Sequence, residues 1–342
     1  MKKVFGKSIF LFISAVLLLA LTACGSEKEK VGKKSNESTD VVTINVAYGN
    51  QPGEPLDLQA KKWKELAEEK SNGKLELKLY PSSQLGSEKD VVEQAIMGNN
   101  VIIFTGYDFL MDYVPDVGIF TAPYLTENFD DLLYLTTTDW YKGLNDQLKS
   151  KDIFIVNTNT IYGTRHLMTT KPVETPEDLK GMKIRVPNNQ MYIKSFEALG
   201  ATPTPMPLAD LYTALQQGLV DGAENPLPVL NGSKTQEVAK HLTLTGHTKI
   251  LSPWIAGTKF METVPEDLVQ ILVDSGNEAG TYGREVAEKE AESVLAQFES
   301  EGIEIHEVDV EKFREAAKSV YTAFPNWTPN LYENVQELLK NR

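Results

Sequence analysis

The chain has 342 residues, of which 41% are hydrophobic and 24% are charged, and its formal net charge is −14. That length exceeds the needs of one small core and fits two lobes. The acidic balance argues against nucleic-acid binding, which requires a basic face to neutralise phosphates. It also means that an anionic ligand needs local positive charge, because the overall field repels it.

The N-terminal segment 1–23 is typical of a lipoprotein signal peptide. Basic residues precede an apolar run, and small residues precede Cys24. Cys24 is the only cysteine in the chain, so no intramolecular disulfide can form. The apolar run is too short to span a hydrocarbon core of about 30 Å comfortably. Leu21–Cys24 resembles the bacterial lipobox, in which the cysteine is lipid-modified, so we expect a lipid-anchored, extracytoplasmic protein. An uncleaved anchor is the alternative.

Residues 24–41 contain almost no apolar residues and predict a flexible tether. Apolar residues then alternate at 42–48 and 75–79, which predicts two strands, and 101–104 is a continuous apolar run typical of a strand covered on both faces. A helix over 56–67 and another that Ser87 can cap lie between these strands. This order implies parallel pairing with right-handed crossovers.

Further helices and strands follow. Residues 129–149 predict a helix and 153–156 a buried strand, and a second lobe is expected to begin near Tyr162. Within it, 165–168 is strand-like, and a short helix opens at 175–178, where proline suits the first helical position.

Residues 181–226 predict strand, helix, strand, helix and strand in succession. The KIRV segment at 183–186 is short, half apolar and ends at a proline, as a buried strand entering a turn does. Asn188 or Asn189 can cap the helix that follows. A Glu-Asn pair, 224–225, lies where the last strand ends.

The remainder predicts strands at 242–245 and 254–258 and then a long helix that begins after Pro265. At about 1.5 Å per residue this helix would approach about 50 Å, longer than one lobe, so we expect it to lie across both. A bend is expected at one of three internal glycines, which are Gly276, Gly280 and Gly283. Two closing helices are predicted near 311–321 and 331–339.

No motif for catalysis or metal binding is evident. The four histidines, His166, His241, His247 and His306, have no recognisable metal-ligand spacing, and no phosphate loop, dinucleotide loop or nucleophile elbow occurs. The sequence therefore predicts no metal and no cofactor, and it leaves an enzyme unsupported.

Arg185 is the unusual residue of the 183–186 strand. Arginine is rarely buried without a partner, so a strand that carries one into a sheet either exposes it or directs it at an anion. Ligands of open α/β sheets bind beyond the carboxyl ends of the strands, and lobed binding proteins close on them by hinge motion. These observations favour an extracytoplasmic receptor for a small molecule. Two other classes stay open, an extracellular hydrolase of acidic saccharides and a lipoprotein that binds another protein.

Five segments together resemble one known family, the solute-binding proteins of TRAP transporters, of DctP type. The segments are KLYPSSQLGSEKDVVEQAIMG at 78–98, RVP at 185–187, GATPTPMP at 200–207, YTALQQGLVDGAENP at 212–226 and TGH at 245–247. The resemblance implies a receptor that captures an organic acid and delivers it to a membrane permease driven by an ion gradient. It also implies a monomer.

The resemblance implies a two-lobed, periplasmic-binding-protein-like α/β fold with a hinge and a long C-terminal helix that crosses both lobes. We expect lobe I to contain residues 42–162 and about 251–288, and lobe II to contain 163–250 and about 289–342.

The same resemblance implies the ligand contacts. The arginine of RVP, Arg185, is expected to pair with a carboxylate, since a guanidinium fork suits that group and stays charged. Asn225 of the DGAENP segment and Arg165 of an upstream G-T-R segment are expected to add contacts. Glu224 is a weaker candidate.

Five further candidates come from their positions near strand and helix ends. Glu88 could accept hydrogen bonds from ligand hydroxyls or serve as a helix-start carboxylate, and Asn50 and Asn188 could bind the ligand or only cap and turn the chain. Tyr107 could form a wall of the cleft, as could Trp254, although aromatic residues near strand ends often belong to the core.

The expected ligand is a sugar acid such as a hexuronate, and a C4-dicarboxylate held by both arginines is the alternative. Sialic acid is disfavoured by two departures from the receptors that bind it. Gly106-Tyr107 stands where they have an acidic residue after the third strand, and Leu208 stands where they have an aromatic residue.

Overall fold

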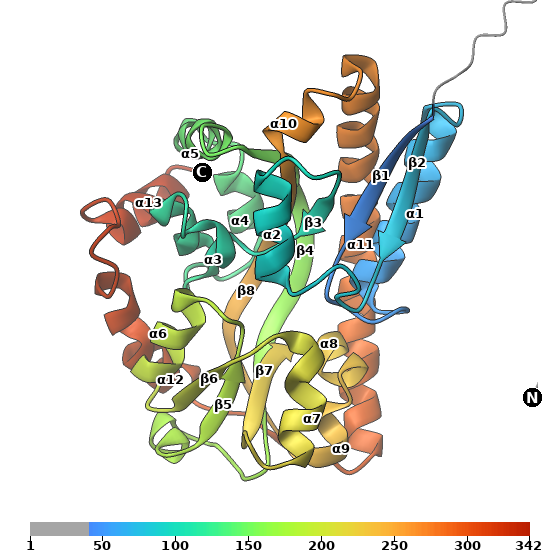
Figure 1. The fold of residues 1–342 in the computed structure, drawn as a ribbon. Coiled ribbons are helices and arrows are strands. Elements are labelled where there is room, and N and C mark those ends of the chain that lie inside the picture. Colours follow the sequence, from blue (N-terminus) through green and yellow to red (C-terminus); the bar gives the residue numbers. More distant parts are fainter. Residues whose placement is uncertain (1–40) are drawn as a thin grey trace, which may run out of the picture. The chain divides into compact units, whose positions relative to one another are not determined.

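The computed structural model describes residues 41–342 (Figure 1). The predicted signal peptide, Cys24 and all but the last residue of the predicted tether lie outside the described residues. Within 41–342, no helix combines the length and the apolar character that crossing a membrane requires.

The strands of this region form one nine-stranded mixed sheet with the order β2-β1-β3-β8-β4-β7-β5-β6, and β9 pairs with β8. The strands are β1 (Val42–Ala47), β2 (Leu75–Tyr80), β3 (Ile102–Phe104), β4 (Ile153–Thr169), β5 (Lys183–Val186), β6 (Thr202–Pro205), β7 (Gly222–Pro226), β8 (His241–Gly257) and β9 (Glu304–His306). β1 pairs in parallel with β2 and β3, and β5 pairs in parallel with β6 and β7. The predicted parallel pairing of the first three strands is confirmed.

β4 and β8 join the two parallel parts of the sheet and differ from the prediction. Each is a single strand of 17 residues, whereas the sequence predicted two short strands in each place. They pair antiparallel, with register shifts at four positions between Ile155 and Leu167. Each shift interrupts the alternation of apolar and polar side chains, so only the regular ends of the strands are evident in the sequence.

Helices cover the sheet. Those before β4 are α1 (Pro55–Lys70), α2 (Glu88–Ile96), α3 (Tyr107–Leu110), α4 (Phe129–Leu135), α5 (Asp139–Lys149) and the 3₁₀ helix η1 (Pro115–Thr121). Between β4 and β8 lie η2 (Pro176–Leu179), α6 (Gln190–Ala198), η3 (Leu208–Asp210), α7 (Leu211–Gln216), α8 (Leu227–Gly232) and α9 (Thr235–Val238). After β8 follow α10 (Thr258–Met261), α11 (Glu266–Ser300), α12 (Val310–Ala317), η4 (Lys318–Thr322) and α13 (Leu331–Lys340).

The helix predicted over 129–149 is two helices, α4 and α5, separated by three threonines. The hydroxyls of Thr136 and Thr138 donate to carbonyl oxygens three residues earlier, both at 2.7 Å. The Thr138 hydroxyl also accepts from the backbone N–H of Tyr141 and so caps α5. Threonine favours such local bonds, which compete with a continuous helix.

The long helix α11 has 35 residues and none of its three glycines breaks it, while the predicted bend stays a prediction. The glycines allow close packing. A Cβ atom on Gly276 would lie 2.8 Å from Nδ2 of Asn157 and 3.1 Å from Cε2 of Trp63. Figure 1 shows α11 running beside α1 at one end and α8 at the other, and α11 contacts both helices.

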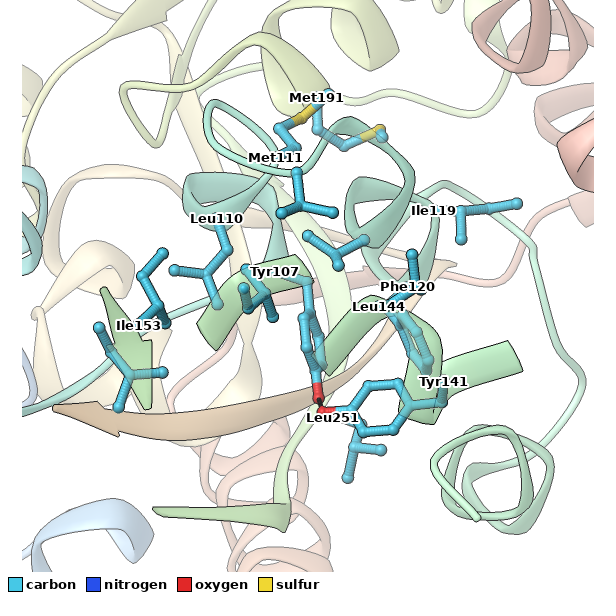
Figure 2. Packing of buried hydrophobic residues seen from close by; sticks show 14 of the residues in the cluster. Tyr107, Leu110, Met111, Ile119, Phe120, Tyr141, Leu144, Ile153, Met191 and Leu251 are labelled. Carbon is cyan, nitrogen blue, oxygen red and sulfur yellow. Dashed lines mark hydrogen bonds between the residues drawn. The ribbon is translucent and has the colours of Figure 1, made fainter. Parts of the chain in front are cut away.

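Buried side chains pack on both faces of the sheet. On β3, Ile103 joins one cluster, while Ile102 and Phe104 join a second cluster on the opposite face, as the alternation of a strand requires. Figure 2 shows part of the first cluster, in which the rings of Tyr107 and Phe120 stack with centroids 4.6 Å apart.

Candidate functional site

A cleft lies where the carboxyl ends of β1, β3 and β5 approach β4, β7 and β8. It encloses about 850 Å³ including its open mouth, within the range of roughly 300–1,000 Å³ common for small-molecule sites. Six of the seven residues predicted as ligand contacts line it, and they are Asn50, Glu88, Arg165, Arg185, Asn188 and Asn225.

Arg185 lies on β5, and only 3% of its surface is exposed. Its Nε and Nη2 donate to the carbonyl oxygen of Met206, at 3.1 and 2.8 Å. Within residues 41–342 it forms no ion pair with a carboxylate. Burial lowers the pKa of Arg185 to about 10, so the side chain stays charged at neutral pH. A buried cation that lines a cleft without a counter-ion is suited to an anionic ligand.

Arg165, on β4, differs from Arg185 because Glu224 already neutralises it. Its Nε and Nη2 donate to the two carboxylate oxygens of Glu224, at 2.5 and 2.6 Å, and its guanidinium stacks over the ring of Tyr192. Burial opposes the charge of Arg165, but the Glu224 carboxylate outweighs it and raises the pKa of Arg165. The pair therefore makes no net contribution of charge to the cleft.

His247 completes this buried pair. Its Nε2 donates to Oε2 of Glu224 at 3.2 Å, and its Nδ1 lies 2.7 Å from the hydroxyl oxygen of Thr245. Burial disfavours ionisation of Glu224, yet Arg165 and His247 outweigh this and lower the pKa of Glu224. His247 thus supports the carboxylate from behind and does not line the cleft.

The three asparagines of the cleft are differently engaged. Asn225 is 2% exposed, and its Nδ2 is buried without a hydrogen-bond partner among the described residues. A buried amide without a partner costs free energy, so Nδ2 is available for a ligand oxygen. Asn50 already donates to Glu54 and lies 3.1 Å from the hydroxyl of Tyr162. Asn188 is exposed at the cleft, and Asn189 caps α6.

Two carboxyl groups flank Gly106, which follows β3. Oε1 of Glu88 accepts hydrogen bonds from the Thr105 hydroxyl at 2.8 Å and from the Gly106 N–H at 3.0 Å. Asp108 lines the same cleft, and a Cβ atom on Gly106 would lie 1.9 Å from Oδ1 of Asp108. Glycine at 106 therefore leaves the space that the Asp108 carboxyl group occupies. Burial raises the pKa of both, and Glu88 adds to the shift of Asp108, whose pKa is about 8.

Asp108 is the functional candidate that the sequence analysis missed. An acidic residue does follow β3 into the cleft, at 108 and not at 106–107, so one of the two arguments against sialic acid falls. The signal available in the sequence was an acidic residue two positions after Gly106, just beyond the end of a buried strand. Leu208 does line the cleft, as the second argument requires.

Tyr107 does not line the cleft, which corrects the prediction that placed it among the ligand contacts. Figure 2 shows it in the hydrophobic core, where its hydroxyl lies 2.6 Å from that of Tyr141. The turn of α3 directs Asp108 to the cleft and Tyr107 into the core. Trp254 is likewise wholly buried, with its indole N–H donating to the Thr160 hydroxyl.

Comparison with known proteins gives a family match over most of the chain. The family model described as bacterial extracellular solute-binding protein, family 7 (DctP), matches residues 46–326. The sialic acid-binding periplasmic protein SiaP of Vibrio cholerae is 34% identical over 269 residues, which are 78% of this chain and 83% of that protein.

Two crystal structures of TRAP periplasmic solute-binding proteins are more similar in sequence. One, from Actinobacillus succinogenes with bound L-galactonate, is 46% identical with a TM-score of 0.86 and covers 88% of this chain and 100% of its own. The other, from Ochrobactrum anthropi with bound L-fuconate, is 45% identical with a TM-score of 0.86 and covers 87% and 99%.

Proposed function

We propose, from the premise that this chain belongs to the DctP family of bacterial extracellular solute-binding proteins, that it is the receptor of a TRAP transporter for a sugar acid. The observation that carries the proposal is Arg185, a buried guanidinium that lines the cleft and has no carboxylate partner within residues 41–342. The ligand's carboxylate supplies that partner, and bidentate pairing fits the guanidinium fork.

The rest of the cleft suits a ligand rich in hydroxyl groups. Glu88 and Asp108 can accept hydrogen bonds from hydroxyls, and the free Nδ2 of Asn225 can donate to one. A polyhydroxylated acid with one carboxylate uses both kinds of group. The bound L-galactonate and L-fuconate of the two similar crystal structures are compounds of this kind and support a hexonate or a hexuronate.

The pairing of Arg165 argues against a C4-dicarboxylate. Such a ligand would need a second free cation for its second carboxylate. Nε and Nη2 of Arg165 already donate to the Glu224 carboxylate. Two further carboxyl groups, those of Glu88 and Asp108, line the cleft. Beyond Arg185, the lining offers a dianion only the exposed Lys89 as a further cation that has no ion pair among the described residues, and the second carboxylate would lie near two carboxyl groups.

We propose that the receptor captures its ligand in the open cleft, closes by hinge motion and then docks on the permease, with no covalent chemistry. The predicted lipid anchor on Cys24 would hold a monomeric receptor at the outer face of the membrane.

The lobe boundaries given above remain predictions. Trp327 donates to the carbonyl oxygen of Pro115 and packs in the same cluster as Phe120, which supports assigning residues 318–342 to lobe I instead of lobe II.

The first test is titration of L-galactonate, L-fuconate and succinate into wild type and Arg185→Ala by calorimetry. We expect the two sugar acids to bind and the variant to lose about 2–5 kcal/mol of binding free energy, roughly 30-fold or more in affinity. Arg284→Ala, an arginine outside the cleft, is the matched control and keeps its affinity. Unchanged affinity in Arg185→Ala would refute the assignment, and tight binding of succinate would favour the dicarboxylate alternative.

The same ligands separate the receptor from its rivals. A receptor yields the sugar acid intact after prolonged incubation, as mass spectrometry would show, and its melting temperature rises with ligand concentration. L-galactonate and L-fuconate contain no glycosidic bond, so an acidic disaccharide is incubated in the same way, and release of its monosaccharides would indicate the hydrolase. A protein-binding lipoprotein would show no stabilisation by any small acid.

A further inference from the structure

Three potential metal ligands meet at the pairing of β8 with β9, outside the cleft. The strands pair in parallel, with His241 beside Glu304 and Thr243 beside His306. Because side chains two residues apart share one face of a strand, Glu304 and His306 lie on the same face of β9. Their ligand atoms and that of His241 all lie within 4.8 Å of one another.

Two of the three separations match the geometry of a tetrahedral metal site, and the ligand atoms of the third pair, Glu304 and His306, lie within 4.8 Å of each other. Nδ1 of His241 lies 3.2 Å from Nε2 of His306 and 3.4 Å from Oε2 of Glu304. With metal–ligand bonds of about 2.0–2.2 Å, the ligand atoms of a tetrahedral zinc ion lie roughly 3.3–3.6 Å apart. Both separations are close to that edge length, so small side-chain adjustments suffice.

A second carboxylate supports the orientation of one ring. Oε1 of Glu174 lies 3.8 Å from Nδ1 of His306, the ring nitrogen on the other side from His241. A carboxylate there favours the proton on Nδ1 and leaves the lone pair of Nε2 for a metal, as in carboxylate–histidine–zinc arrangements.

Burial leaves one side of the cluster open. The rings of His241 and His306 are 15% and 14% exposed and are held by the sheet, whereas Glu304 is 68% exposed. An ion bound here could therefore complete its coordination with water on the solvent side.

We propose that His241, His306 and Glu304 bind one divalent transition-metal ion, best matched by Zn²⁺, with water in the fourth position. Two imidazoles and a carboxylate suit zinc better than calcium or magnesium, which prefer oxygen ligands. The ion would link β9, the strand that follows α11, to the start of β8. The sequence analysis missed this site because His241 and His306 are 65 residues apart and only strand pairing brings them together.

The test is calorimetric titration of Zn²⁺ into the untagged protein, with melting temperature measured in parallel. Wild type should bind one ion and melt at a higher temperature with it, because the ion binds the folded state preferentially. His306→Ala and Glu304→Gln should each weaken binding at least tenfold. Glu301→Gln removes a nearby exposed carboxylate outside the cluster and should bind as wild type does.

Glu304→Gln keeps the test decisive even if His306→Ala disturbs the strand, since Glu304 is largely exposed. Co²⁺ provides a second readout, because its visible spectrum reports tetrahedral coordination in wild type and should be lost in the two cluster variants. The proposal is overturned if wild type binds no stoichiometric Zn²⁺, or if all variants bind it equally well.

Discussion

Arg185 is buried with its charge and has only the Met206 carbonyl oxygen as a hydrogen-bond acceptor among the described residues. An uncompensated buried charge destabilises the ligand-free protein. A carboxylate ligand removes this cost, so binding and folding stability are coupled at this residue. Arg165, twenty positions earlier, is equally buried but is paired with Glu224, so its charge is balanced before any ligand binds.

Asp108 gives the residue-scale prediction, which concerns pH. Burial first, then the charge of Glu88, raise the pKa of Asp108 to about 8, against about 3.9 in an unfolded chain. Between these values the folded protein holds a proton that the unfolded chain releases, so the free energy of unfolding falls as pH rises through this window. Asp108→Asn cannot ionise, so its melting temperature relative to wild type should increase from about pH 4 to about pH 8.

Thermal denaturation across that pH range measures the effect. Asp112→Asn, an exposed carboxylate outside the cleft, is the control and should follow the wild-type pH profile. An offset between Asp108→Asn and wild type that stays the same at every pH would contradict the prediction.

At the scale of elements, α11 depends on glycine where it passes the sheet. Gly276→Val places methyl groups against Asn157 and the ring of Trp63, whose indole N–H donates to the Leu272 carbonyl oxygen. Overpacking of this kind costs about 1–3 kcal/mol. Urea denaturation should show that loss although valine favours a helix more than glycine does, and Glu285→Val, on an exposed face of the same helix, shows the effect of a valine without that contact. Equal stability of the two variants would mean that the contact is not tight.

Elements with a local signal were predictable from the sequence. Ser87 caps α2 as expected, and the alternation at 42–48 and 75–79 became β1 and β2. The long strands β4 and β8 were not recognised as continuous, because their register shifts remove the alternation. The unbroken path of α11 also depends on side chains of other elements, which helix propensity does not encode.

The same distinction applies to the site. Residues at strand ends, such as Arg185 and Asn225, could be predicted because parallel strands bring their carboxyl ends together. The role of Glu224 could not, since its partner Arg165 lies 59 residues away on an antiparallel strand. Tyr107 and Asp108 are adjacent in sequence, and only the turn of α3 decides which of them meets the cleft.

At the scale of the whole molecule, β4, β8 and α11 connect the regions on either side of the cleft. If closure on the ligand bends these connections, the radius of gyration should fall when L-galactonate is added. Small-angle X-ray scattering measures this change. Arg185→Ala at the same ligand concentration should keep the larger radius of gyration. In the wild type, the decrease should occur at ligand concentrations that match the affinity measured by calorimetry. A radius that ligand leaves unaltered would exclude large closure.

The ion pair of Arg165 with Glu224 also limits how ligand preference can evolve. One substitution that removes the Glu224 carboxylate would leave a second guanidinium that lines the same cleft without a counter-ion among the described residues. We therefore expect that Glu224, which neutralises Arg165, determines whether the cleft prefers a monoanion or a dianion. A new preference needs no rebuilt cleft, only a chain stable enough to tolerate a second unpaired charge in its interior.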